Sequence, residues 1–252
     1  MNSKVFTTSL KNETLGFALV IGVWAVVSGL YPSYIIPTPF EVVTQASAYL
    51  PADLLQQSGV TLWRMLQGFG LALLLGILIT LVVHFVRAQQ LAMSVLMAIQ
   101  VIPGTILGVV FLLMFGLGGA APVMMILVLV LPTVVISLIG GLEKRDRQQE
   151  QYLASLHARP SLVLSHVLLP ALVPAIQNSL SLGFSLAAKV VVLAEYIGAQ
   201  DGLGYLLNRA QVTLNMKEVF FYLLLLLVFT LVFQAAQTAF FTTFFKKYSY
   251  PA

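Results

Sequence analysis

The chain has 252 residues, of which 59% are hydrophobic and only 9% are charged. Soluble domains carry roughly 25% charged residues, and a soluble protein with a mean hydropathy of +0.96 would expose too much apolar surface to stay monomeric. This composition excludes an ordinary soluble enzyme, a disordered protein and a coiled coil, and it leaves a polytopic membrane protein. The chain has no cysteine, which excludes disulfides, thiolate metal sites and a cysteine nucleophile.

Six stretches of the chain are long and apolar enough to cross a bilayer, for which a helix needs about 20 residues. The stretches are continuous rather than alternating, which favours helices over the strands of a membrane barrel. We therefore predict an all-α polytopic membrane protein with six transmembrane helices in a single domain over residues 1–252. The predicted spans are Thr14–Leu30, Leu62–Val86, Leu91–Phe115, Pro122–Leu142, Ala171–Gly198 and Val219–Phe245.

Lysine and arginine gather on one side of these predicted spans. With the N-terminus inside, nine of them fall in cytoplasmic segments, while the outer side holds only Arg64, Arg209 and Lys217. Such a bias sets the orientation of a membrane protein. We therefore expect both termini in the cytoplasm, and we interpret the net charge of +4 as a topology signal rather than as a nucleic-acid surface.

Two connections on the outer side have recognisable features. The segment over residues 31–61 is rich in proline, and its middle part, Phe40–Leu50, is compatible with a short helix at the membrane interface. The sequence FGLGGAA at Phe115–Ala121 predicts a tight glycine turn, so the third and fourth spans should form a hairpin.

The long inner segment over residues 143–169 is the polar centre of the chain. It begins with EKRDRQQE, and then Tyr152, Leu153 and Leu156 form one apolar edge of a short helix. Pro160 cannot continue that helix but suits the first turn of a new one, which leads into the fifth span. Two interpretations stay open: a solvated inner loop with helical character, or a helix that docks on a cytoplasmic partner.

Polar side chains inside the spans are the candidate pathway residues, because charges at membrane depth are costly and usually functional. Lys189 lies mid-way along the fifth span with Ser185 one turn before it, and a lysine facing a cavity would favour an anionic solute; a structural lysine is the alternative. Gln100 and Thr105 flank Pro103 and line either the pathway or a packed kink. Glu195, near the outer end of the fifth span, belongs to a gate or dimer contact, or caps the structure.

Several short motifs together resemble a known family. They are YIIPTP at Tyr34–Pro39, TLWRMLQGF at Thr61–Phe69, QVIPG at Gln100–Gly104, FGLG at Phe115–Gly118 and VVVLAEYIGAQDGLG at Val190–Gly204. In this order and spacing the chain resembles ABC importer permeases of the nitrate, sulfonate and taurine group. The resemblance covers about residues 31–234 and implies the type I importer permease fold.

The family's inner motif, Glu-Ala-Ala-x-x-x-Gly followed nine residues later by Ile-x-Leu-Pro, is only half kept. VLLP at Val167–Pro170 matches its end, whereas Gln151 stands at the glutamate and His157 at the glycine. The resemblance implies that this segment couples the chain to an ATPase. The implied coupling residues are Gln151, Tyr152, Leu153, Leu156, His157, Ala158 and Arg159.

The resemblance also implies an assembly in the bacterial inner membrane. Two permease copies would form the pathway for a small, possibly anionic organic solute, an external solute-binding protein would deliver it, and lipid would surround the spans. Two cytoplasmic ATPase subunits would bind ATP and magnesium, because this chain has no phosphate-binding loop and needs no cofactor of its own. Arg64 would anchor at the headgroups or bind an acidic group of the delivery protein.

Two other functions compete with transport. The divergent stretch Gln151–His157 also fits a degenerate permease-like scaffold or regulatory subunit. An intramembrane enzyme would need a nucleophile and base or a metal cluster, and the chain has neither Gly-x-Ser-x-Gly nor His-Glu-x-x-His. We therefore expect no catalytic residues and no metal site, and we interpret His84 and His166 as interfacial.

Overall fold

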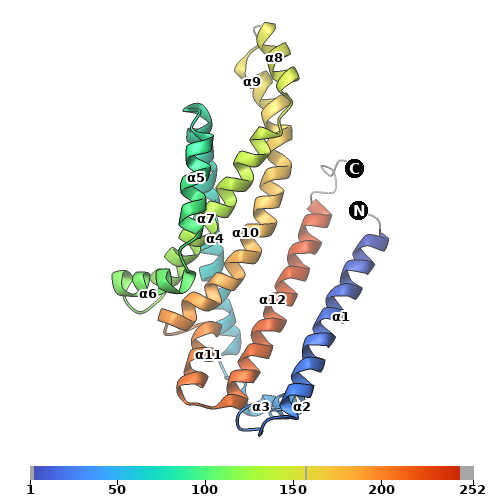
Figure 1. Ribbon diagram of the computed structural model, residues 1–252, viewed down its shortest axis with the longest axis vertical. Helices are drawn as coiled ribbons and strands as arrows, with labels where there is room; N and C mark the ends of the chain where they lie inside the picture. Colours follow the sequence, from blue (N-terminus) through green and yellow to red (C-terminus); the bar gives the residue numbers. More distant parts are fainter. Residues whose placement is uncertain (1–2, 157, 245–252) are drawn as a thin grey trace.

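The computed structural model describes residues 3–156 and 158–244, and its regular elements there are all helical. Figure 1 shows long helices running roughly side by side, with shorter helices at both ends. The elements are α1 Ser3–Ser28, α2 Pro39–Thr44, α3 Ala46–Tyr49, α4 Leu54–Phe85, α5 Gln89–Gln100, α6 Gly104–Phe115, α7 Ala120–Glu143, α8 Arg147–Ser155, α9 Pro160–Val163, a π-helix at Leu164–Leu168, α10 Leu169–Gly198, α11 Leu203–Val212 and α12 Met216–Phe244.

The membrane-spanning helices follow the hydropathy prediction, with two differences of extent. Among the described residues, α4, α7, α10 and α12 are each long and apolar enough to cross a membrane. The apolar part of α1, Leu15–Ser28, is shorter than a full span. Helix α4 begins at Leu54, inside the predicted outer segment, so this helix extends well beyond the predicted span.

The third predicted span is divided into two helices at Pro103, where a kink was one of the two expectations, and the bend is far sharper than a kink within one helix. Helices α5 and α6 meet at an angle of 85°, with Val101–Pro103 between them. Pro103 lacks a backbone N–H and drives the preceding residue away from helical angles, so the first helix ends before it. Figure 1 shows α6 lying across the direction of the long helices. The predicted glycine turn follows α6, and Gly116 and Gly118 both adopt positive φ.

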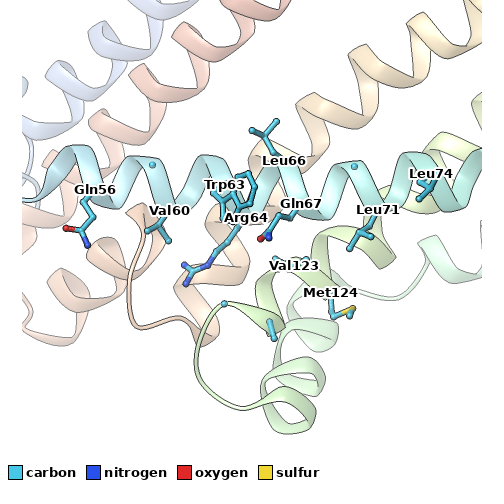
Figure 2. Close-up of a pocket in the computed structure, with 14 residues that line it drawn as sticks. Gln56, Val60, Trp63, Arg64, Leu66, Gln67, Leu71, Leu74, Val123 and Met124 are labelled. Atoms are coloured by element: carbon cyan, nitrogen blue, oxygen red, sulfur yellow. The ribbon is translucent and has the colours of Figure 1, made fainter.

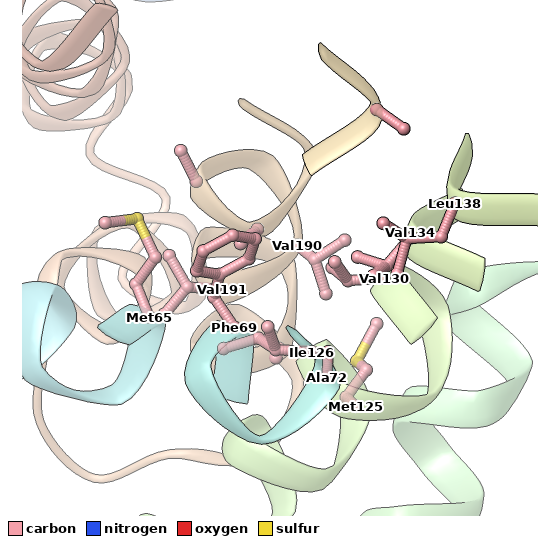
Figure 3. Close-up of a cluster of buried hydrophobic side chains, with 14 residues drawn as sticks. Met65, Phe69, Ala72, Met125, Ile126, Val130, Val134, Leu138, Val190 and Val191 are labelled. Carbon is pink, nitrogen blue, oxygen red and sulfur yellow. The ribbon is translucent and has the colours of Figure 1, made fainter. Parts of the chain in front are cut away.

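Helix α7 is at the centre of the packing and contacts α4, α5, α6 and α10. Figure 3 shows the main core cluster, in which Met65 and Phe69 of α4, Ile126 and Val130 of α7, and Val191 of α10 meet. Helices α4 and α7 approach closely at Gly68, where an added Cβ would lie 2.6 Å from the Cβ of Ile126. Small residues allow such contacts between membrane helices.

The proline-rich segment before α4 contains two short helices, α2 and α3, where one short helix over Phe40–Leu50 was expected, and both contact α12. Thr38 and Glu41 form a reciprocal capping box at the start of α2, and Pro39 occupies its first turn. The Tyr222 hydroxyl of α12 donates to the Tyr49 carbonyl of α3 at 3.3 Å. The Tyr222 bond joins this segment to α12.

At the opposite end, α8 and α9 extend beyond the bundle on the side toward which α1 begins and α12 ends (Figure 1). Asp146 caps α8, because its Oδ1 accepts from the Gln148 and Gln149 amides at 2.9 and 3.1 Å. The predicted restart at Pro160 is confirmed. The chain then passes through the π-helix into α10, so α8 is joined to this span through a non-α segment.

Candidate functional site in the bundle

One face of α10 carries polar side chains along most of its length. Asn178, Ser181 and Lys189 are exposed, and Ser185 lies half-buried between them. Asn178 and Lys189 are eleven residues apart, which is close to three helical turns, so both lie on the same face. Within the described residues, Lys189 forms no ion pair. An unpaired cation on an open helix face in a membrane protein is available to a ligand.

Helix α7 adds two hydroxyl groups to this polar surface. The Asn178 Nδ2 donates to Ser137 Oγ at 3.0 Å, and the Gln100 Nε2 at the end of α5 donates to Thr133 Oγ1 at 3.3 Å. Thr133 and Ser137 are one turn apart on α7, a hydroxyl pair at i, i+4 that the sequence analysis missed. Gln100 is therefore connected to the polar surface, whereas the exposed Thr105 lies beyond the bend, in α6.

Glu195 is in a different environment, because it is fully buried. Its carboxylate accepts hydrogen bonds from Thr61 Oγ1 at 2.8 Å, from the Arg64 guanidinium at 3.0 Å and from the Gly204 amide at 3.1 Å. A carboxylate with this many donors is satisfied within the protein. The structure therefore supports the structural alternative for Glu195 and places it away from the open face of α10.

Arg64 completes this buried network. The prediction that its side chain anchors at the headgroups or binds an acidic group of the delivery protein was therefore wrong. Only 6% of the residue is exposed, and its guanidinium also donates to the Asp201 carbonyl at 2.9 Å and pairs with the Asp201 carboxylate. Arg64 lies about three turns inside α4, because this helix starts at Leu54. The planar fork of arginine suits several acceptors at once.

Helix α4 uses one face to hold the loop between α10 and α11. Gln57, Thr61 and Arg64 are spaced i, i+4 and i+7, and so lie on one side of the helix. Thr61 Oγ1 accepts from the Leu203 amide at 2.9 Å, and Gln57 Oε1 accepts from the Gly202 amide at 2.5 Å. The ends of α4, α10 and α11 that lie opposite α8 are thereby tied together; we call these contacts the outer network.

Gly202 of this loop and Gly204 at the start of α11 are both required by this arrangement. Gly202 has a φ of +99°, and an added Cβ there would overlap the carboxylate of Glu195. At Gly204 an added Cβ would overlap the Val192 carbonyl oxygen and lie 2.7 Å from the Glu195 Cβ. Glycine permits both the positive φ and the close approach. One buried contact with Glu195 therefore explains why positions 202 and 204 are both glycine.

A groove of about 1030 Å³ lies between α4 and the first part of α7. Figure 2 shows Trp63, Gln67, Leu71 and Met124 along it, and the Arg64 side chain extends from α4 between those of Val60 and Gln67. Its lining is mainly apolar, and Arg64 is engaged with Glu195 and Asp201. Among the described residues, no group of three or more His, Asp or Glu side chains is placed to hold a metal ion.

The predicted coupling residues lie on and after α8. Tyr152 and Leu156 are 65% and 59% exposed, and they form an uncovered apolar edge one turn long. Gln151 and Arg159 are exposed, while Leu153 and Ala158 are half-buried. His157 lies outside the described residues.

Comparison with known proteins identifies the class of this chain. Residues 72–245 match the family model of the binding-protein-dependent transport system inner membrane component. The chain belongs to this family. It is therefore the permease subunit of an ABC importer and a multi-pass protein of the inner membrane, which fits a role in transport rather than in catalysis.

Three relatives resemble the permease over most of its length. A probable ABC transporter permease protein of Haemophilus influenzae is 29% identical over 88% of this chain and 93% of its own. The formylaminopyrimidine transport permease protein of Halalkalibacterium halodurans is 24% identical over 82% of this chain and 84% of its own. A putative aliphatic sulfonates transport permease protein of Bacillus subtilis is 26% identical over 81% and 75%.

A solved structure of an amino acid ABC transporter with histidines has the same fold. It superimposes with a TM-score of 0.57 and 17% sequence identity, over 81% of this chain and 97% of the other. The all-α permease fold expected from the sequence is thereby confirmed.

Proposed function

We propose that the permease conducts a small organic anion along the polar face of α10. The observation that carries this proposal is the exposed Lys189, which forms no ion pair with another described residue and lies in line with Asn178 and Ser181 on a membrane-spanning helix. A cation attracts an anion strongly in surroundings of low dielectric constant. The hydroxyl and amide groups farther along the face would replace water around the solute as it passes.

The proposed assembly contains two copies of the permease, two cytoplasmic ATPase subunits and an external binding protein. In a single chain the polar face of α10 is open, and a second copy would close it into a pathway. We place α8 and both termini in the cytoplasm, which agrees with the lysine and arginine bias. ATP and magnesium would bind to the ATPase, and closure of the ATPase pair would favour one of two packings of the spans.

The proposed solute class follows from charge. The relative from Bacillus subtilis is named for aliphatic sulfonates, whose single negative charge suits one lysine. The relative named for formylaminopyrimidine shows that the family also takes ring compounds. Lys189 therefore favours a sulfonate or carboxylate as the class for this permease.

The direct test uses proteoliposomes that contain the permease and its ATPase, with the binding protein outside. We expect uptake of a radiolabelled sulfonate that requires ATP. Uptake by the permease alone, driven by an ion gradient, would overturn the proposal. ATP hydrolysis without any uptake would favour the scaffold or regulatory function instead.

Lys189→Ala is expected to lower uptake of the anion by about ten- to a hundredfold, since hydrogen bonds to a charged group contribute about 1.5–3 kcal/mol. Lys189→Arg keeps the charge and should retain most of the uptake. Lys217→Ala, on the outer side of the membrane, is the matched control and should change uptake less than twofold. Unchanged kinetics for Lys189→Ala would remove this lysine from the pathway.

The apolar edge of α8 is expected to bind the ATPase. Replacing both Tyr152 and Leu156 with serine removes two exposed apolar side chains, so association with the ATPase should weaken about tenfold or more. The double substitution Gln148→Ala and Gln149→Ala is the control, because both residues are exposed and lie one turn before this edge on the same face of the helix, so the two apolar side chains stay in place. Co-purification and a binding titration measure the effect. Equal affinity for both variants would contradict docking through the apolar edge.

A further inference from the structure

A second cavity, of about 830 Å³, lies at the end of the bundle that carries α8. Two separate connections form its walls: the turn between α4 and α5, and the junction of α7 with α8. Gln151, the first predicted coupling residue, is part of its lining. Apart from Ala88 and Leu91, the residues that line it are polar or charged. The full lining is His84, Arg87, Ala88, Gln89, Gln90, Leu91, Glu143, Arg145, Glu150 and Gln151.

Some of the charged side chains that line this cavity form ion pairs with other described residues, and others do not. Arg145 is engaged, because it pairs with Glu150 at 2.8 Å and donates to the Leu142 carbonyl at 3.0 Å. Arg87 and Glu143 are exposed, and neither forms an ion pair within the described residues. The Nδ1 of His84 is buried there and has no hydrogen-bond partner in the described part of the chain.

The backbone of the first wall is held in an unusual conformation. Arg87 has a φ of +55°, in the left-handed region that side chains other than glycine rarely adopt. Its amide donates to the His84 carbonyl at 3.2 Å, and the next amide reaches the Val83 carbonyl at 3.0 Å. This closes the end of α4 as a helix C-cap would. The backbone amides of this turn are thus hydrogen-bonded to the end of α4, and the Arg87 side chain remains exposed at the cavity.

We propose that this cavity is a second contact site for the cytoplasmic ATPase, which would place side chains of both signs against Arg87 and Glu143. The inference rests on the proposed function, in which α8 docks on the same partner. A lipid phosphate fits the cavity poorly, because Glu143 would repel it and Arg145 and Glu150 neutralise each other. A protein surface with an acidic and a basic side chain matches Arg87 and Glu143, which form no ion pair with any other described residue.

A contact at this cavity would act on α4 as well as on α8. Helix α4 is continuous over 32 residues, or about 48 Å at 1.5 Å per residue. Its inner end forms one wall of the cavity, and its outer half carries Thr61 and Arg64 of the outer network. Movement of the ATPase would therefore reach the outer ends of α10 and α11 along α4, in parallel with the route through α8.

The test uses the absence of cysteine from the chain, which makes each introduced thiol unique. Arg87→Cys and Glu143→Cys report on the cavity, Tyr152→Cys reports on α8, and Gln211→Cys reports on the outer side. Each variant is placed in inside-out vesicles, and the rate of labelling by a membrane-impermeant maleimide is measured with and without the ATPase. All three inner variants should label without the ATPase, which shows that these positions are accessible in the permease alone.

We expect the ATPase to slow labelling of the Arg87→Cys, Glu143→Cys and Tyr152→Cys variants by at least about tenfold, while the Gln211→Cys variant stays unlabelled. Slowing at Tyr152→Cys alone would overturn the second contact and leave docking through α8 intact. No slowing at any inner position would overturn both.

Charge reversal supplies an independent readout. Arg87→Glu should weaken binding of the ATPase about three- to tenfold, whereas Arg87→Lys should not. Lys144→Glu reverses an exposed charge that does not line the cavity, and it serves as the matched control. Equal binding by the Arg87→Glu and Lys144→Glu variants would contradict the proposal.

Discussion

Arg64→Ala is expected to destabilise the folded permease by about 3–5 kcal/mol, the usual cost of removing one partner from a buried ion pair. The substitution leaves the fully buried carboxylate of Glu195 without its only cationic partner in the described residues. The loop at Asp201 also loses the guanidinium that holds it. Thermal unfolding of the purified permease in detergent, followed by circular dichroism, measures the effect as a lowered midpoint.

Arg209→Ala is the matched control for this prediction. Arg209 is half exposed and lies 3.8 Å from Glu218, and such a surface pair contributes at most about 1 kcal/mol. Arg64→Lys keeps the charge but not the planar fork, so its unfolding midpoint should fall between those of wild type and Arg64→Ala. Similar midpoints for Arg64→Ala and Arg209→Ala would show that the outer network contributes little to the fold.

Gly204→Ala is expected to destabilise the permease by about 1–3 kcal/mol, because overpacking a tight contact forces the backbone to shift. The new methyl group would overlap the Val192 carbonyl oxygen, and the start of α11 would have to move away from α10. That movement lengthens the hydrogen bond from the Gly204 amide to Glu195. The unfolding midpoint and the ATP-dependent uptake should both decrease.

Gly140→Ala separates this steric effect from a general effect of replacing glycine. Gly140 lies inside α7 with no atom within 4 Å of the position of an added Cβ. Alanine there should be neutral or stabilise the helix by about 0.5–1 kcal/mol. The two substitutions are therefore expected to have opposite signs, and a loss of stability in both would refute the close-contact explanation.

Helix α10 has two sides with different roles: one side joins the outer network, and the other is the exposed polar face. Glu195 and Lys189 lie six residues apart on α10, and one is sealed against α4 while the other is open. The buried side fixes how α10 meets α4 and α11. The open side is left for the solute and, in our proposal, for the second copy.

The sequence alone determined the features that depend on local chemistry. Hydropathy located the spanning helices because each of these must be apolar over its whole length in a bilayer. Proline and glycine marked the end of α5, the turn after α6 and the restart at Pro160, since these residues restrict or free the backbone at their own positions. The permease class also followed from ordered local motifs.

Only the tertiary structure decided which distant residues meet. Arg64 and Glu195 are 131 positions apart, and Asn178 and Ser137 are 41 apart. Many polar pairs are compatible with the same hydropathy pattern, and the close packing of α4, α7 and α10 selects among them. Pro103 predicted a break, but the 85° bend is stabilised by the packing of α6 against α7 and α10. The sequence pattern specifies where each helix begins and ends and how apolar it is, whereas packing in three dimensions specifies which face of one helix contacts which face of another.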